Sequence, residues 1–289
     1  MNGIILIDKP EGWTSHDVVA KLRGALHERR AGHSGTLDPM ATGLLVLFFG
    51  RATRAVEFAE ADEKEYTAGI KFGLRTDTQD ITGTVEERCP ASFTPEELEN
   101  VLSRFRGEID QLPPMYSAIK VGGKKLCDIA RRGGSVERKA RRITIFSLET
   151  EAFSTDEMTL RVRCSKGTYI RTLCADIGDA LGCGACMSSL RRTRAGIFDL
   201  SQAHSIDEVL SSAERGEADS LLLPVDTLFS GYESIRLSEN QERCLRNGGR
   251  FSSPGNDGEY RAYSSGGEFI ALVSRCGGVI SSIKSFYEV

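Results

Sequence analysis

The feature that most constrains this chain is a glycine-rich segment that leads directly into its longest apolar run. Gly32, Gly35 and Gly43 bracket a single acid, Asp38, and the apolar residues Leu44–Phe49 then follow without interruption. Glycine permits backbone conformations and close approaches that a side chain would block. A short continuous apolar run is typical of a buried strand. The segment therefore predicts a tight loop that holds one carboxylate at the entrance to a buried strand.

The residues alone leave two interpretations of Asp38 open. Asp before Pro is a common turn initiator, whose carboxylate accepts hydrogen bonds from nearby amides. A carboxylate held in a glycine loop can instead act on a substrate. Nothing in the local composition around Asp38 and Pro39 chooses between a structural turn and a catalytic acid.

Length and composition limit the classes of protein that the chain can be. With 289 residues, of which 40% are hydrophobic, it can form one large domain or a large and a small one. Neither a spanning helix nor a signal peptide fits apolar runs this short. Eight cysteines without a disulfide framework predict reduced thiols and a cytoplasmic protein, and the lone pair Cys183 and Cys186 is a weak metal signal.

The net charge of −4 hides an uneven distribution of charged residues. From Lys120 to Arg142 nine Lys or Arg stand against only Asp128 and Glu137. A second basic stretch runs from Arg161 to Arg194. Segregation of this kind predicts an electropositive face that neutralises phosphates. The alternative, that these side chains are merely solvated, stays open.

Local patterns predict the elements around the glycine loop. Thr14 and Asp17 form a capping-box signal, and apolar residues at helical spacing then predict a helix over 15–28. Residues 66–72 alternate between apolar and polar, the period of a half-buried strand, so Tyr66 is expected on the apolar face. An ordinary core tyrosine, whose hydroxyl is satisfied by a hydrogen bond, would also explain that position.

Two more helices are predicted further along the chain. Thr94 begins a helix that Gly107 ends. A strand over 160–164 precedes helical spacing that starts at Ile170, which places Arg171 in the first turn of a helix. Since the amide groups and the dipole at a helix start favour an anion, a carboxylate could be held ionised there.

The C-terminal part has a different pattern, with short segments punctuated by glycine. The change suggests a domain boundary near residue 230. Ser238 and Gln241 give a capping box for a short helix, and residues 260–263 and 269–273 predict a hairpin. Strands and helices are both visible, so an α/β chain is expected, but their order alone does not separate one α+β architecture from another.

Five segments resemble a known family. Residues 32–43 are similar to the GHxGTLDPxATGLL motif of the TruB family of tRNA pseudouridine synthases. Four further segments, one before this motif and three after it, match in the family's order. The match covers the chain from Lys9 to about Arg194. They are IDKPEGWTS at 7–15, EY at 65–66 with GLRTDTQD at 73–80, QLPPMYSAIK at 111–120, and KGTYIRTL at 166–173.

The resemblance implies a fold and a domain plan. The implied fold is α/β of the α+β type, with the mixed, largely antiparallel sheet of pseudouridine synthases. Residues 1–230 would form the catalytic domain, with an RNA-gripping insertion at about 113–142. Residues 231–289 are similar to the PUA domain, a small β-barrel that binds RNA. Cys127 falls in the insertion where the family commonly has Tyr.

The implied activity is the isomerisation of uridine 55 in the tRNA T-loop to pseudouridine. Neither a metal nor a cofactor is expected, because the chain lacks the phosphate-loop, dinucleotide and HExxH motifs.

The implied partner is tRNA, through its T-stem and T-loop, and a monomer without an obligate protein partner or membrane contact is expected. A non-catalytic tRNA-binding or folding factor is the alternative. An Asp/His hydrolase lacks a recognisable His-Asp-nucleophile set.

The resemblance also assigns roles to individual residues. Asp38 would start the reaction, as a nucleophile on the ribose, as a nucleophile on the base, or as a base that takes a ribose proton. Arg171 would keep Asp38 ionised, since a buried unpaired carboxylate tends to protonate. Tyr66 would pack on the uracil, a role more secure than proton abstraction from C5, because a tyrosine of ordinary pKa is a poor base.

The remaining implied contacts concern the nucleotide and the RNA backbone. A stacked uridine must be extruded before it can react, and the family resemblance gives His33 the task of filling the vacated space. Ordinary packing or surface charge would also explain each of these positions. The implied pocket residues are Tyr169 and Leu190, the residues that support the catalytic loop are Lys9 and Pro10, and the phosphate contacts are Lys124, Lys125, Arg131 and Arg132.

Overall fold

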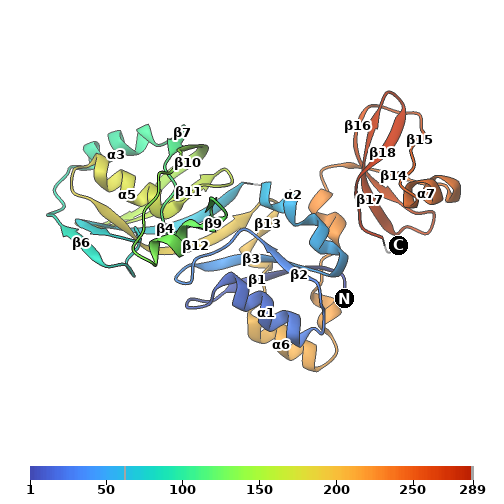
Figure 1. Cartoon of the computed structure of the whole chain (residues 1–289), viewed down its shortest axis with the longest axis horizontal. Coiled ribbons are helices and arrows are strands. Elements are labelled where there is room, and N and C mark those ends of the chain that lie inside the picture. Colours follow the sequence, from blue (N-terminus) through green and yellow to red (C-terminus); the bar gives the residue numbers. More distant parts are fainter. Residues whose placement is uncertain (62, 288–289) are drawn as a thin grey trace.

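A computed structural model describes residues 1–61 and 63–287. Within these residues the main unit is built on one nine-stranded sheet with the path β1-β3-β12-β4-β11-β10-β7, to which β2 and β13 add at β3 and β12 (Figure 1). The pairing of β3 with β12 is parallel and the other pairings are antiparallel, so the mixed, largely antiparallel sheet is confirmed. The strands are β1 (Gly3–Lys9), β2 (Ala31–Ser34), β3 (Thr42–Phe49), β4 (Lys64–Phe72), β7 (Gly107–Gln111), β10 (Arg141–Phe153), β11 (Glu157–Cys164), β12 (Ala185–Ala195) and β13 (Phe198–Asp199).

Helices cover one face of this sheet in two groups. Figure 1 shows α3 (Pro95–Arg104) and α5 (Ile170–Ala180) over the half that contains β4 and β11. It shows α1 (Ser15–Ala25) and α6 (Ile206–Glu214) beside β1 and β3. All four helices contribute side chains to one hydrophobic core.

The apolar run Leu44–Phe49 lies within β3, and its side chains are buried on both faces of the sheet. Leu45, Leu47 and Phe49 belong to the core under the helices. The alternate residues, of which Leu44 and Phe48 are two, face a second core instead. Because successive strand side chains point to opposite faces, a run without polar residues is the pattern that two covered faces require.

The second core joins the main unit to the C-terminal unit. Phe286 and Leu272 of the C-terminal unit pack in the same cluster as Phe229 and the outer face of β3. The rings of Phe58 and Phe229 meet edge to face with centroids 5.2 Å apart. Arg54 donates to the carbonyl of Ser285 at 3.0 Å. The C-terminal unit is thus fixed to the back of the strand that follows the glycine loop.

The C-terminal unit is a curled five-stranded sheet with one helix, a half-barrel rather than a closed barrel (Figure 1). The predicted hairpin is present as two paired antiparallel strands. The order along the sheet is β14-β16-β17-β18-β15. The elements are β14 (Glu233–Arg236), α7 (Glu239–Arg246), β15 (Phe251–Ser252), β16 (Gly258–Tyr263), β17 (Phe269–Cys276) and β18 (Val279–Ser285).

Smaller elements project from the main sheet between its long strands. A hairpin of β5 and β6 follows β4, and a second hairpin, β8 with β9, leads into the short helix α4. Among the described residues, none of the helices combines the length and the apolarity that crossing a bilayer requires. The bounds are α2 (Val56–Ala61), β5 (Leu74–Thr76), β6 (Val85–Arg88), β8 (Lys120–Val121), β9 (Lys124–Lys125) and α4 (Leu126–Ala130).

Two predicted capping boxes and the predicted helix start at Thr94 are confirmed, and one helix boundary is wrong. Thr14, Thr94 and Ser238 each cap a helix with the reciprocal side-chain contact three residues on. The first helix ends at Ala25 and not at residue 28. His27 has a φ of +50°, in the left-handed region that a helix cannot continue through.

Candidate active site

The loop that carries Asp38 is held from both sides by the N-terminal segment. Ser15, which is buried, donates its hydroxyl to the carbonyl of Leu37 at 3.1 Å and accepts the amide of Leu37 at 2.8 Å. The amide of Gly12 donates to the carbonyl of Pro39 at 2.8 Å. The backbone on each side of Asp38 is therefore fixed, while 35% of the Asp38 side chain stays accessible.

Asp38 forms a two-point ion pair with Arg171. The Nε of Arg171 lies 2.8 Å from Oδ2 of Asp38, and its Nη2 lies 3.4 Å from Oδ1. Arg171 also donates to the carbonyls of Thr78 at 3.1 Å and Tyr116 at 2.8 Å. Only 7% of its side chain is exposed. A buried arginine in the first turn of α5 thus joins three loops, and its planar fork orients the carboxylate.

A second acid, Asp80, lies on the far side of Arg171, and the sequence analysis gave it no role. Its Oδ2 is 3.9 Å from the Nε of Arg171. Its Oδ1 accepts from the hydroxyl of Thr78 at 2.9 Å and from the amide and hydroxyl of Thr82 at 3.0 and 2.6 Å. The RTDTQD segment contained this acid, but no local signal connected it with an arginine so far along the chain.

Tyr66 lies on β4, half-buried against the core under the helices, as the alternation predicted. Burial raises the pKa of its hydroxyl above the ordinary value, although the nearby guanidinium of Arg192 works in the opposite direction. Tyr66 is therefore a neutral phenol at pH 7, which favours packing against a base over proton abstraction.

His33 and Tyr169 hold defined positions near this region. Burial and the charge of Arg192 lower the pKa of His33, so its ring is neutral at pH 7, and its buried Nδ1 has no hydrogen-bond partner among the described residues. Tyr169 precedes α5, where the side chain of Gln111 binds its backbone twice, at 3.0 Å to the carbonyl and 2.8 Å to the amide. The sequence analysis gave Gln111 no role of its own, because it stood there only as the first residue of a motif.

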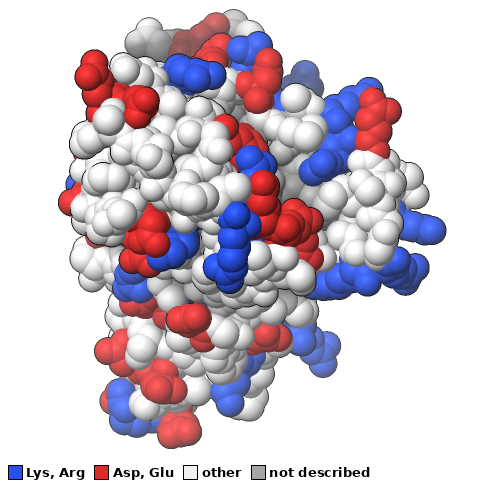
Figure 2. Space-filling model, turned by 90° about the vertical axis from the view of Figure 1, so that its left-hand side faces the viewer, with Lys and Arg blue, Asp and Glu red and all other residues white. Residues whose placement is uncertain are grey.

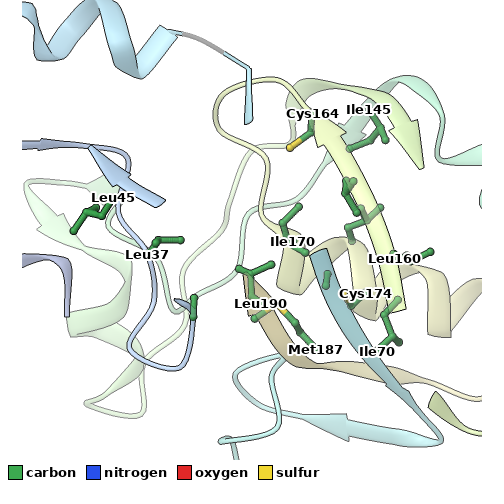
Figure 3. Close-up of a cluster of buried hydrophobic side chains, with 14 of the residues drawn as sticks. Leu37, Leu45, Ile70, Ile145, Leu160, Cys164, Ile170, Cys174, Met187 and Leu190 are labelled. Atoms are coloured by element: carbon green, nitrogen blue, oxygen red, sulfur yellow. The ribbon is translucent and has the colours of Figure 1, made fainter. Parts of the chain in front are cut away.

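Leu190 and Pro10 differ in their surroundings. Leu190 is buried on β12, and Figure 3 shows it with Ile170 at the end of the core that faces Leu37, the neighbour of Asp38. Pro10 is exposed. Leu190 therefore borders the loop that carries Asp38, whereas Pro10 contributes its carbonyl to the contacts of its neighbour Lys9.

Lys9 ends strand β1 rather than lying in a loop, and its side chain has no exposed surface. Its ammonium donates to the carbonyls of Pro10 at 2.9 Å, Trp13 at 2.7 Å and Pro39 at 3.4 Å. Burial lowers its pKa to about 8, against the opposing effect of Asp38. Enclosed in this way, Lys9 supports the loop that carries Asp38 through its contact with Pro39.

Lys9→Met is expected to lower the free energy of unfolding by about 1 to 3 kcal/mol, because the partly buried carbonyls of Pro10 and Trp13 lose their donor and Pro39 keeps only the amide of Gly12. Met fills a similar volume, so the change isolates the hydrogen bonds. Urea denaturation at pH 7 measures the effect. Lys21→Met on the exposed side of α1 is the control and should stay within about 0.5 kcal/mol of the unchanged chain. Equal stability of Lys9→Met and the unchanged chain would contradict the supporting role.

The four basic residues predicted to contact phosphates are all exposed. Lys124 and Lys125 form β9, and Arg131 and Arg132 follow α4. Arg131 approaches Asp128 at 3.9 Å, and the other three form no ion pair with a described residue. Figure 2 shows Lys and Arg side chains gathered along the right-hand edge of its view, while both signs mix over the rest of that face.

Comparisons with known proteins place the chain in a family. Residues 23–170 match the model of the N-terminal domain of TruB family pseudouridylate synthases, and residues 171–230 match the C-terminal domain of tRNA pseudouridylate synthase B. The tRNA pseudouridine synthase B of Azoarcus sp. is 47% identical over 273 residues, which is 94% of this chain and 90% of that protein. The chain belongs to the TruB family of pseudouridylate synthases.

Further similarities support the family and the fold. The tRNA pseudouridine synthase B of Ralstonia nicotianae is 44% identical over 277 residues, covering 93% of this chain and 87% of that protein. A chain in the crystal structure of a Cbf5–Nop10–Gar1 complex superimposes with a TM-score of 0.75 at 25% identity, over 99% of this chain and 85% of its own length. The TruB chain is accordingly an isomerase with the pseudouridine synthase fold.

Proposed function

We propose that this TruB chain converts uridine 55 in the T-loop of tRNA to pseudouridine, with Asp38 as the residue that starts the reaction. The observation that carries the proposal is the two-point pair between Asp38 and Arg171, at 2.8 and 3.4 Å. The buried guanidinium contacts both carboxylate oxygens and so fixes their orientation. The carboxylate is still partly exposed, so a substrate can reach it.

The reaction needs no external reagent. The bond between N1 and C1′ breaks, the uracil turns, a bond between C5 and C1′ forms, and the C5 proton is lost while N1 gains one. Asp38 attacks the ribose, attacks the base, or removes a ribose proton, and its ionised form serves each route. Tyr66 is a neutral phenol in this site, so we assign it to packing against the uracil ring.

Recognition of the tRNA is assigned to four parts of the chain. The target uridine is stacked in the folded loop, so it must be extruded, and His33 beside the catalytic loop would fill its place. Tyr169 and Leu190 would line the pocket for the extruded base. The exposed basic insertion at about 113–142 would contact phosphates, and residues 231–289 would form a PUA-like RNA-binding unit.

The assay that tests the proposal uses a T-loop transcript with tritium at C5 of uridine. Purified protein without an added cofactor should release tritium and leave a nucleotide that carbodiimide labels as pseudouridine. Binding of the transcript without release would favour the alternative, a non-catalytic tRNA-binding factor. Release of free uracil would point to hydrolysis of the glycosidic bond.

A salt titration tests the basic insertion. Replacing Lys124, Lys125, Arg131 and Arg132 by Ala is expected to weaken tRNA binding and to flatten its salt dependence. Each neutralised phosphate contributes about 0.7 to 0.9 to the slope of log affinity against log salt, so the slope should fall by about 2 to 4. Filter binding at several salt concentrations measures it, and the saturated rate should change much less.

The control for this titration changes the same charge elsewhere. Lys21, Arg23, Arg104 and Arg215 are exposed and lie outside the insertion. Their combined replacement by Ala lowers the net charge equally but should leave most of the slope intact. If the two quadruple variants lose the same slope, the insertion acts only through net charge and makes no specific phosphate contact.

A further inference from the structure

Arg192 occupies the point where three strands of the main sheet meet. On β12 its Cα lies opposite Tyr66 of β4 on one side and opposite Gly43 of β3 on the other. Only 1% of Arg192 is exposed, which makes it the largest fully buried side chain among the described residues. A directly opposite pair of residues on neighbouring strands places both side chains on one face. Arg192 and Tyr66 therefore share the face that carries the active site.

The guanidinium of Arg192 is bound by backbone carbonyls. Its Nε donates to the carbonyl of Leu44 at 2.7 Å and its Nη2 to the carbonyl of Gly35 at 3.0 Å. Across residues 1–61 and 63–287, no carboxylate oxygen lies within 4.0 Å of it. Enclosing a charge without a partner of opposite charge is costly, and an apolar side chain of similar volume would avoid that cost.

Two glycines of the catalytic loop fit closely around Arg192. A side chain at Gly35 would place its Cβ 3.2 Å from Nη1 of Arg192. Gly43 has a φ of +97°, and a Cβ there would collide with the backbone of Arg192. The motif that carries Asp38 is therefore shaped to Arg192 at both of its ends, as well as to Arg171 at its centre.

We infer that Arg192 is a positioning residue of the isomerase, which fixes the catalytic loop at Gly35 and orients Tyr66 toward the uracil. The inference rests on the proposed function of the site. Arg171 holds the carboxylate of Asp38, and Arg192 holds the start of the same loop and the aromatic ring opposite it. Burial raises the pKa of Tyr66 and lowers that of His33, and the charge of Arg192 opposes the first effect and adds to the second, which agrees with its place among these side chains.

A double-mutant cycle between Arg192 and Tyr66 tests the inference. Arg192→Lys keeps the charge but loses the planar donors. We expect kcat to fall about 10-fold to 100-fold, because a small misplacement of groups in the site lowers the rate by about this much. The KM for tRNA should change less than about 3-fold. In a Tyr66→Phe background the same substitution should have at most half of that logarithmic effect, because coupled residues are not additive.

The control is the preceding residue of the same strand, Arg191. Arg191 pairs with Asp8 on the other face, at 3.1 and 2.7 Å, and Arg191→Lys should leave kcat unchanged. Urea unfolding of Arg192→Lys and of Arg192→Met gives the folded fraction by which kcat is divided. A smaller loss in the Tyr66→Phe background than in the wild-type background supports the inference.

Three results would overturn it. Equal losses in the wild-type and Tyr66→Phe backgrounds would show that Arg192 does not act through Tyr66. A loss of turnover that follows the loss of folded protein in Arg192→Lys and Arg192→Met would show a structural role only. Absence of turnover in the wild type would refute the proposed function itself, and this inference with it, whereas the first two results leave the proposed function standing.

Discussion

Asp38→Asn is expected to reduce turnover more than about 10³-fold while tRNA binding stays near that of the unchanged protein. The amide has nearly the volume of the carboxylate, so the loop held by Ser15, Gly12 and Lys9 keeps its shape. What disappears is the charge, and with it every route by which Asp38 starts the reaction. Single-turnover tritium release from a C5-labelled T-loop transcript measures the rate, and filter binding measures the affinity.

Asp179→Asn provides the matched control for this change. Asp179 lies on α5, the helix that carries Arg171, and its exposed carboxylate pairs with Arg75 at 2.8 Å. We expect its turnover to stay within about 3-fold of the unchanged protein, since surface pairs contribute little. Mass spectrometry must first exclude deamidation of the introduced asparagine back to aspartate. Turnover of Asp38→Asn above about one hundredth of the unchanged rate after that check would refute the catalytic assignment.

The parts of the fold that were predictable depend on neighbours in the sequence. The capping box at Thr14 satisfies amides within its own first turn, so residue spacing is enough to find it. The buried run Leu44–Phe49 is apolar because both faces of β3 are covered. The end of the first helix was missed because the left-handed conformation falls on His27, whereas glycine is the residue type that usually indicates such a helix end.

The parts of the site that were missed depend on register between distant strands. Gln111 reaches Tyr169 across 58 positions, and Asp80 meets Arg171 only after the hairpin that follows β4 folds back toward α5. Arg192 stands in a basic stretch of the sequence, where a solvated charge is the ordinary expectation, yet its strand register buries it. Residue types do not encode which of two adjacent arginines points inward until that register is known.

Arg171→Lys is expected to lower kcat about 10²-fold to 10³-fold, with a smaller change in KM, because a single ammonium cannot reproduce the fork. Arg171 contacts both oxygens of Asp38 and the carbonyls of Thr78 and Tyr116 at once. A lysine retains a positive charge near the carboxylate, so the substitution alters the geometry of the pair more than its charge. The expected loss therefore reports orientation rather than charge. Single-turnover rates at saturating transcript measure it.

The same substitution at Arg75 separates this effect from a general loss of arginine contacts. Arg75 pairs with Glu87 at 3.1 Å and Asp179 at 2.8 Å but is 38% exposed, so Arg75→Lys should keep its turnover within about 3-fold. Arg171→Lys should also unfold more easily, by about 1 to 3 kcal/mol, because two carbonyls in the site lose a donor. If Arg171→Lys retained full turnover, charge alone would suffice to prepare Asp38. The fixed loop would then have to supply the orientation by itself, through Ser15 and Arg192.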